Sequence, residues 1–229
     1  MIINDGHITI DNNACNENWT KINNFFKGEG NGRICNRITG LRIITAIRDE
    51  LNEDDIYLEI GTLNGGSVCL SMLHPKKCHH VCIDPFNGYY IKGGDTKNPE
   101  WNILYKDSSS KGSDTVAPVI DNIKKINVHN HTYHLIKNYS TDKNALVETD
   151  QYRGKVGLLL IDGDHTRWGA KFDFDNYYEL VKPGGYIIFD DYDGHTVTEA
   201  VEECLAEYAD KIETSTEFES VFVIKLKEN

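Results

Sequence analysis

The sequence of 229 residues lacks any apolar run long enough to cross a membrane, which takes about 20 consecutive apolar residues. It is also short of basic residues, with 24 Lys and Arg against 36 Asp and Glu and a net charge of −12. Nucleic-acid backbones and anionic membrane surfaces attract basic proteins, so neither is an expected partner. A neutral or cationic small molecule fits this charge better.

Clustered cysteines and a secretory signal are missing too. The six cysteines are scattered, so we expect reduced thiols and a cytoplasmic protein. Cys78 and Cys82 lie near histidines, but their spacing does not match a structural zinc site. Without repeats or linkers, the chain is predicted to form an Asn-rich arm over residues 1–27 and one domain over residues 28–229. The arm is expected to pack on that domain or on a second subunit, which leaves a homo-oligomer open.

Buried strands and amphipathic helices alternate along the chain. Apolar runs predict strands at 56–60, 79–83, 132–136, 158–161, 186–189 and 220–226. Helical spacing predicts helices at 34–51, 68–73, 116–126, 142–149, 167–181 and 196–209. The stretch 182–185, Lys-Pro-Gly-Gly, is predicted to stop the helix before it. This α/β order predicts a single Rossmann-like, doubly wound, mostly parallel sheet, which binds ligands at the carboxyl ends of its strands.

A glycine-rich turn follows the strand at 56–60. It reads E-I-G-T-L-N-G-G-S from Glu59 to Ser67 and leads into a helix. Glycines allow a sharp turn and a close ligand, and the start of the next helix offers free amide donors. Its glycines are spaced differently from those of the dinucleotide fingerprint. Asp84 ends the next strand, where a carboxylate can accept both hydroxyl hydrogens of a ribose.

Two further glycine-bearing stretches have no clear motif. Residues 28–32, G-E-G-N-G, lack a preceding strand, so we interpret them as a hinge or helix lead-in rather than a phosphate cradle. Residues 86–113 are long and polar, as binding loops often are. The aromatic residues Tyr89, Tyr90 and Trp101 make this segment the candidate for substrate specificity.

Acidic residues end two strands that are expected to be neighbours. Asp162 follows the strand at 158–161, and Asp190 and Asp191 follow the strand at 186–189. Adjacent strands lie ~5 Å apart, so these three carboxylates would come within reach of one ion. An all-oxygen set suits Mg²⁺, Mn²⁺ or Ca²⁺. The alternative is that the acids cap the next helix and face water.

A metal at this place would lower the pKa of a coordinated substrate hydroxyl. Asp164 and His165, just beyond Asp162, are both candidates to take the proton. The sequence pattern does not choose between them.

Taken together, these motifs resemble the class I S-adenosylmethionine (SAM)-dependent methyltransferases. The closest likeness is to the metal-dependent sugar O-methyltransferases of the macrocin and novobiocin type and to the cephalosporin hydroxylase-like group. It rests on E-I-G-T-x-x-G-G-S at 59–67, the acid at 84, I-D-G-D-H at 161–165 and K-P-G-G-Y-I-I-F-D-D-Y at 182–192. The resemblance spans residues 34–226. It implies about seven strands, the last antiparallel, and methyl transfer from SAM to a hydroxyl of a sugar or glycan.

The resemblance also implies roles for individual residues. The expected cofactor-binding residues are Glu59, Gly61, Thr62, Gly65, Gly66, Ser67, Asp84, Ser140 and Asp162. The expected ligands of Mg²⁺ or Mn²⁺ are Asp162, Asp190 and Asp191. The sugar enzymes use the position of Asp164 as general base, whereas the catechol-type relatives use a lysine where His165 stands. Other readings are a catechol or polyphenol O-methyltransferase, a metal-dependent hydroxylase, and a non-catalytic cofactor-binding module.

Overall fold

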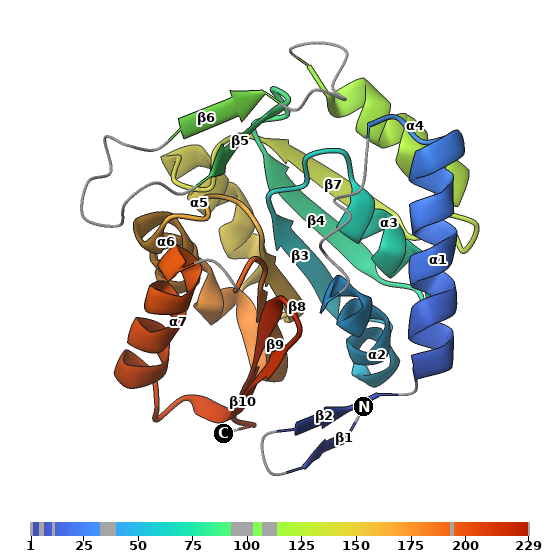
Figure 1. The fold of residues 1–229 in the computed structure, drawn as a ribbon. Helices are drawn as coiled ribbons and strands as arrows, with labels where there is room; N and C mark the ends of the chain where they lie inside the picture. Colours follow the sequence, from blue (N-terminus) through green and yellow to red (C-terminus); the bar gives the residue numbers. More distant parts are fainter. Residues whose placement is uncertain are drawn as a thin grey trace.

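A seven-stranded sheet organises the computed structural model, which describes residues 2–4, 7–10, 12–32, 40–92, 103–106, 114–192 and 195–228 (Figure 1). In spatial order its strands are β10 (Ile212–Phe218), β11 (Val221–Leu226), β9 (Val181–Phe189), β8 (Val156–Ile161), β3 (Ile56–Ile60), β4 (His79–Asp84) and β7 (Thr132–Lys137). β11 pairs antiparallel with both of its neighbours, β10 and β9, and all other pairings in this sheet are parallel. The expected Rossmann-like sheet with a reversed last strand is confirmed.

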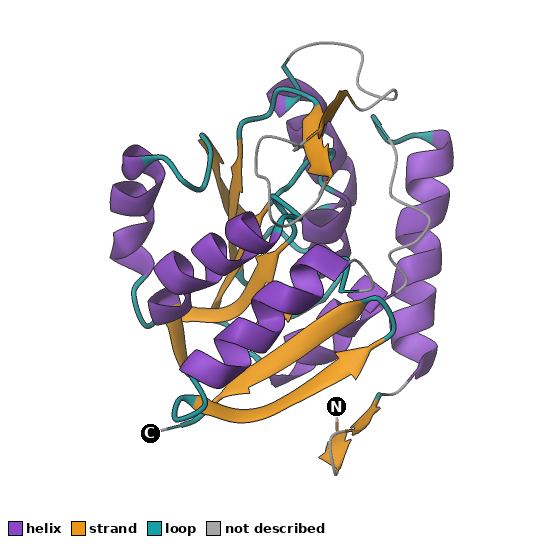
Figure 2. Cartoon of the chain, turned by 60° about the vertical axis from the view of Figure 1, so that its left-hand side comes forward, coloured by secondary structure: helices purple, strands orange, loops and turns teal. Residues whose placement is uncertain are grey.

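Helices cover both faces of the sheet (Figure 2). One face packs against α1 (Asn12–Gly28), α2 (Ile43–Glu50), α3 (Gly66–Met72) and α4 (Val116–Ile126). The other packs against α5 (Lys143–Thr149), α6 (Arg167–Tyr177) and α7 (His195–Glu207). Alternate residues of the buried strands supply the two cores, for example Tyr57 to the first and Leu58 to the second, because successive strand side chains point to opposite faces.

The stretch before β9 departs from prediction. The helix predicted to reach residue 181 ends at Tyr177, a 3₁₀ turn covers Tyr178–Leu180, and β9 begins at Val181. Lys-Pro-Gly-Gly therefore lies inside a strand rather than after a helix. Val156 pairs with Val181 and Leu158 with Tyr186, so the residues between form a bulge against β8. A bulge tolerates Pro183, which has no amide hydrogen to donate.

Three other predictions need correction or stay partly open. β10 was not predicted as a strand. In the segment predicted as a loop at 86–113, β5 (Tyr89–Lys92) and β6 (Ile103–Lys106) pair antiparallel. The side chains of Tyr89 and Tyr90, and all of Trp101, lie outside what the structure describes. Of the helix predicted at 34–51, the structure describes a 3₁₀ turn at Gly40–Arg42 that continues into α2. Residues 33–39 lie outside the described part.

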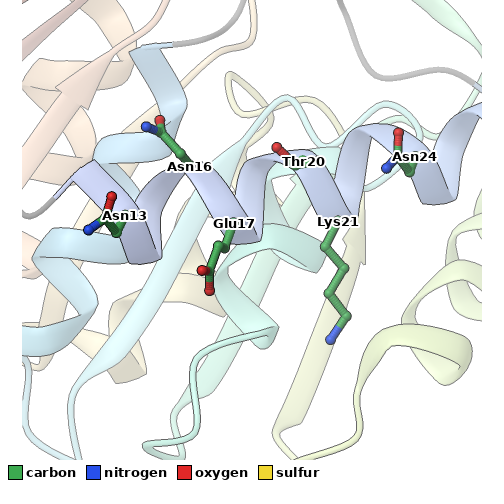
Figure 3. A pocket seen from close by; sticks show the side chains of 6 residues that line it. All are labelled: Asn13, Asn16, Glu17, Thr20, Lys21 and Asn24. Atoms are coloured by element: carbon green, nitrogen blue, oxygen red, sulfur yellow. The ribbon is translucent and has the colours of Figure 1, made fainter.

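The N-terminal arm contains a short hairpin, β1 (Ile2–Asn4) with β2 (His7–Thr9), followed by the long helix α1. Cys15, Ile22 and Phe26 on α1 are buried in the first core. The outer face of α1 carries a shallow hollow with polar walls (Figure 3). Its lining residues are Asn13, Asn16, Glu17, Thr20, Lys21 and Asn24. Within the described residues, no helix combines the length and apolar character needed to span a bilayer.

Candidate active site

The glycine-rich turn after β3 meets the end of β8. Gly61 has a φ of +92°, and a Cβ placed there would lie 1.9 Å from the backbone oxygen of Asp162. Only glycine permits both this conformation and this approach. The amide of Gly61 donates to the oxygen of Ile83 at 2.9 Å. The turn expected to hold the cofactor is thus packed directly against the first of the acidic strand ends.

The rest of the turn is tightly wound. Leu63 and Gly65 both have positive φ, 48° and 83°, and the amide of Gly65 donates to the oxygen of Thr62 at 2.7 Å. Thr62 is 3% exposed, and its side chain interacts with those of Glu59 and Cys82 in the core beneath the turn. Helix α3 begins at Gly66 directly after this turn, so its first amides face the same edge of the sheet.

Glu59 and Ser67 lie behind the turn rather than on its surface. Glu59 is fully buried, and its Oε2 accepts hydrogen bonds from the hydroxyls of Tyr57 at 2.6 Å and Ser67 at 2.7 Å. Burial raises the pKa of Glu59 to about 7, against the hydrogen bonds from Tyr57 and Ser67, which lower it. These contacts tie β3 to the first turn of α3 and so fix the two ends of the glycine-rich turn.

Asp84 holds the other side of the turn. Its Oδ2 accepts from the amide of Leu63 at 2.8 Å and its Oδ1 from the amide of Phe86 at 2.5 Å. The residue is 8% exposed, and burial raises the pKa of its carboxyl, with the backbone hydrogen bonds opposing. The backbone of Thr62 supplies a third hydrogen bond. A carboxylate has about four lone-pair sites, so about one remains for a ribose hydroxyl. The next strand end contributes Ser140, whose backbone oxygen accepts from the hydroxyl of Tyr177 on α6 at 2.8 Å.

The acids after β8 and β9 come together around His165. Its Nε2 lies 3.0 Å from Oδ1 of Asp162, and its Nδ1 lies 2.8 Å from Oδ2 of Asp191. Burial lowers the pKa of His165, but the hydrogen bonds and charges of the two carboxylates outweigh it and hold the pKa well above its usual value. A doubly protonated imidazole is therefore favoured, with one N–H donated to each acid. Asp191 itself adopts a left-handed backbone, with φ of 53°.

Asp190 is the most deeply buried carboxylate of this group. It is 1% exposed, and neither carboxylate oxygen has a hydrogen-bond partner among the described residues. Burial and the charges of Asp162 and Asp191 raise its pKa well above the usual value. The donor chemistry of the three carboxylates suits a hard divalent cation. In their present positions, however, no three His, Cys, Asp or Glu side chains within the described ranges are arranged to hold an ion, and His165 stands between two of the acids.

Asp164 points away from that cluster toward α6. A Cβ on Gly169 would lie 2.4 Å from Cβ and Cγ of Asp164, so glycine there leaves room for the acid. Oδ1 of Asp164 accepts from the amide of Thr166 at 3.0 Å, and the Thr166 hydroxyl caps α6 by accepting from the amide of Gly169. One of its oxygens is thus used at the helix start, as the capping alternative requires. This geometry alone does not decide between Asp164 and His165 as the base.

Asp173 on α6 was not singled out from the sequence. It is 1% exposed, and neither carboxylate oxygen has a partner among the described residues. Burial and the charge of Asp164 raise its pKa to about 7, and the neighbouring Ser140 side chain opposes this only in part. It lies beneath the turn after β8, since a Cβ on Gly163 would come within 3.4 Å of its Oδ2. The missed signal was helical spacing, which places Asp173 on the same face as Ala170 and Tyr177.

Known proteins share this sequence pattern and this fold. A family model described as "Methyltransferase domain" matches residues 58–192. The uncharacterized protein R132 of Acanthamoeba polyphaga mimivirus is 32% identical over 151 residues, 66% of this chain, and the chain covers 58% of that relative's length.

Several solved structures superpose on most of this chain. The O-methyltransferase NovP has a TM-score of 0.59 at 16% identity, covering 83% of this chain and 78% of its own. The calicheamicin methyltransferase CalS11 has 0.56 at 11%, covering 98% and 99%. A Bacillus cereus O-methyltransferase solved with S-adenosylhomocysteine (SAH) has 0.51 at 14%, covering 96% and 93%. At these identities the likeness concerns the fold.

Proposed function

This chain belongs to the methyltransferase-domain family, and from that premise we propose that it transfers a methyl group from SAM to a hydroxyl oxygen of a sugar or glycan. The observation that carries the proposal is that the glycine-rich turn lies against the acidic strand ends, with the backbone of Gly61 in close contact with that of Asp162. A cofactor on that turn and an acceptor at the acids would lie side by side, as direct methyl transfer requires.

For the cofactor, we assign the surface of the turn to SAM. The first amides of α3 face the edge of the sheet where the ligand would lie. Asp84 would use its remaining lone pair for a ribose hydroxyl while the others hold the backbone of Thr62, Leu63 and Phe86. Glu59 and Ser67 would act from behind, by keeping the turn in shape.

For the metal, we assign Asp162, Asp190 and Asp191 to Mg²⁺ or Mn²⁺. The buried carboxylate of Asp190 supports this assignment, because neither of its oxygens has a side-chain hydrogen bond within the described part of the chain and its charged form is disfavoured without a cation. When bound, such an ion would lower the pKa of the acceptor hydroxyl. His165 would have to leave its place between Asp162 and Asp191 to admit it.

We assign proton removal from the acceptor to Asp164. Without a metal, His165 donates to two carboxylates that raise its pKa, and a protonated imidazole has no free lone pair to accept a proton. With a metal, His165 would have left the acids beside which the acceptor lies. Asp164 has a second oxygen beyond the one bonded to Thr166. It follows the same strand as Asp162, but its side chain would have to turn back from Gly169 to reach an acceptor at the acids.

A sugar acceptor is the substrate class we favour. CalS11 is described as a TDP-rhamnose 3'-O-methyltransferase, and two neighbouring sugar hydroxyls suit a site with several acids. A catechol is the second acceptor class to test, since it also offers two adjacent oxygens.

Titration calorimetry with SAM, with and without Mg²⁺, tests the cofactor and the metal. We expect SAM to bind, and methyl transfer from labelled SAM to a nucleotide sugar to stop in EDTA. Asp190→Asn should keep SAM binding and lose the effect of Mg²⁺, whereas Asp210→Asn, a distant exposed acid, should change neither. Absence of SAM binding would refute the function. Transfer unaffected by EDTA would refute the metal, and transfer to catechols alone would refute the sugar.

A further inference from the structure

The G-E-G-N-G stretch, residues 28–32, reaches the cofactor turn from outside the matched family region. After α1 the chain turns back, with the amides of Glu29 and Gly30 both donating to the oxygen of Phe25 at 2.8 Å. The next residue, Asn31, donates its amide to Oδ1 of Asn122 on α4 at 2.7 Å. The N-terminal arm is thus attached to α4 at this point.

Asn122 joins three separate segments. It is fully buried, and besides accepting from Asn31 its Nδ2 donates to the oxygen of Asn31 at 2.8 Å and to the oxygen of Asn64 at 3.0 Å. One side-chain amide offers one oxygen and two N–H groups, so each of these groups is in use. Asn64 lies in the cofactor turn, between Leu63 and Gly65, which both have positive φ.

Gly32 makes the second contact between the same parts. Its φ is +87°, and a Cβ there would lie 2.2 Å from Cγ of Asn64 and 2.4 Å from its Oδ1. The side chain of Asn64 is itself buried, at 3% exposed. The backbone at Gly32 therefore covers the Asn64 amide as closely as a glycine allows.

We propose that Asn122 and Gly32 are positioning residues for the cofactor, and that residues 28–32 form the outer support of the SAM-binding turn. Asp84 holds the turn from the strand side through Leu63, and Asn122 holds it from the helix side through Asn64. The positive φ of Leu63, a non-glycine residue, is unfavourable without such restraint. The inference rests on the proposed function, because it takes SAM as the ligand of this turn.

Asn122→Ala tests the support directly. Removing three buried hydrogen bonds should weaken SAM binding by about 10- to 100-fold. The KM for SAM should rise in proportion, while kcat at saturating SAM stays within about threefold, since saturating ligand restores the turn. Lys124→Ala is the matched control on the same helix: its side chain is exposed, within the described residues it makes no hydrogen bond to residues 28–32 like those of Asn122, and its loss should leave the Kd unchanged.

Gly32→Ala provides a second, independent variant if Asn122→Ala fails to fold. Its methyl group should displace Asn64 and weaken SAM binding, and adding Asn64→Ala should restore most of the affinity, because that change makes room and keeps the carbonyl that Asn122 holds. Failure of the wild type to bind SAM would refute the proposed function and this inference with it. Wild-type binding together with unchanged affinity in folded Asn122→Ala, or no rescue of Gly32→Ala by Asn64→Ala, would overturn the inference alone.

Discussion

The contact between Gly61 and Asp162 allows a quantitative prediction from a single methyl group. In Gly61→Ala, the new Cβ would meet the Asp162 oxygen at 1.9 Å and its carbonyl carbon at 2.4 Å. Both are backbone atoms, so the clash cannot be relieved by rotating a side chain. A second cost comes from the φ of +92° at this position, since a non-glycine residue in the left-handed region costs about 1–2 kcal/mol.

The two costs can be separated with Gly154→Ala. Gly154 also has a positive φ, 68°, but a Cβ there would meet nothing within 4 Å, so this variant carries the backbone cost alone. Overpacking adds about 1–3 kcal/mol. We therefore expect Gly154→Ala to lower the free energy of unfolding by about 1–2 kcal/mol and Gly61→Ala by about 2–5 kcal/mol.

Urea unfolding followed by circular dichroism measures both values, with unchanged m-values as the sign that the unfolded states are comparable. Gly61→Ala should also weaken SAM binding, because relief of the clash must move the turn or the Asp162 strand end, whereas Gly154→Ala should not. Equal destabilisation by the two substitutions would refute the argument that Gly61 is required for close packing. In that case only the backbone conformation would matter at this position.

Three further predictions concern burial. Asp173→Asn should be more stable than wild type above about pH 7 and nearly equal to it below about pH 4. The raised pKa of Asp173 makes the folded state bind its proton more tightly than the unfolded state, so wild-type stability falls as pH rises through this range. Thermal melts across pH measure this difference in stability, and a difference that does not change with pH would contradict the prediction. Ile22→Ala should cost about 2–5 kcal/mol in urea unfolding because Ile22 is fully buried, and a loss under about 1 kcal/mol would mean that α1 is not part of the core. A thiol reagent should modify at most one of the six cysteines before the protein unfolds. Five of them are buried, namely Cys15, Cys69, Cys78, Cys82 and Cys204, and burial raises the pKa of Cys204 to about 12. Rapid reaction of several cysteines in the folded protein would contradict the prediction.

Strong local patterns predicted much of this fold correctly. The strand β3 and the helix α4 have the predicted bounds, because each combines an apolar pattern with clear polar ends. The strand β10 was missed because it is a half-exposed edge strand with the polar sequence I-E-T-S-T-E-F. At residues 182–185 the local Pro-Gly signal suggested a helix stop, but pairing of the flanking residues with β8 placed this stretch in a bulge.

The candidate site shows the same division between local and long-range information. Parallel strand order was enough to predict that the turn after β3 and the acids after β8 and β9 share one edge, and the Gly61 contact with Asp162 confirms that neighbourhood. The place of His165 between two carboxylates could not be predicted, since it depends on how Asp191 turns at the end of β9. The support by Asn122 joins three segments distant in sequence, which no local pattern reveals.

The placement of β11 has a consequence for experiments on fragments. The matched family region, residues 58–192, ends before β11, the strand that pairs with β9 and shields it. A fragment cut at those limits would expose the whole β9 edge of a twisted sheet, which is a template for pairing with other chains. It would also uncover the core that α1 and α2 close. We expect such a fragment to aggregate, so the unit that folds is larger than the unit that sequence families share.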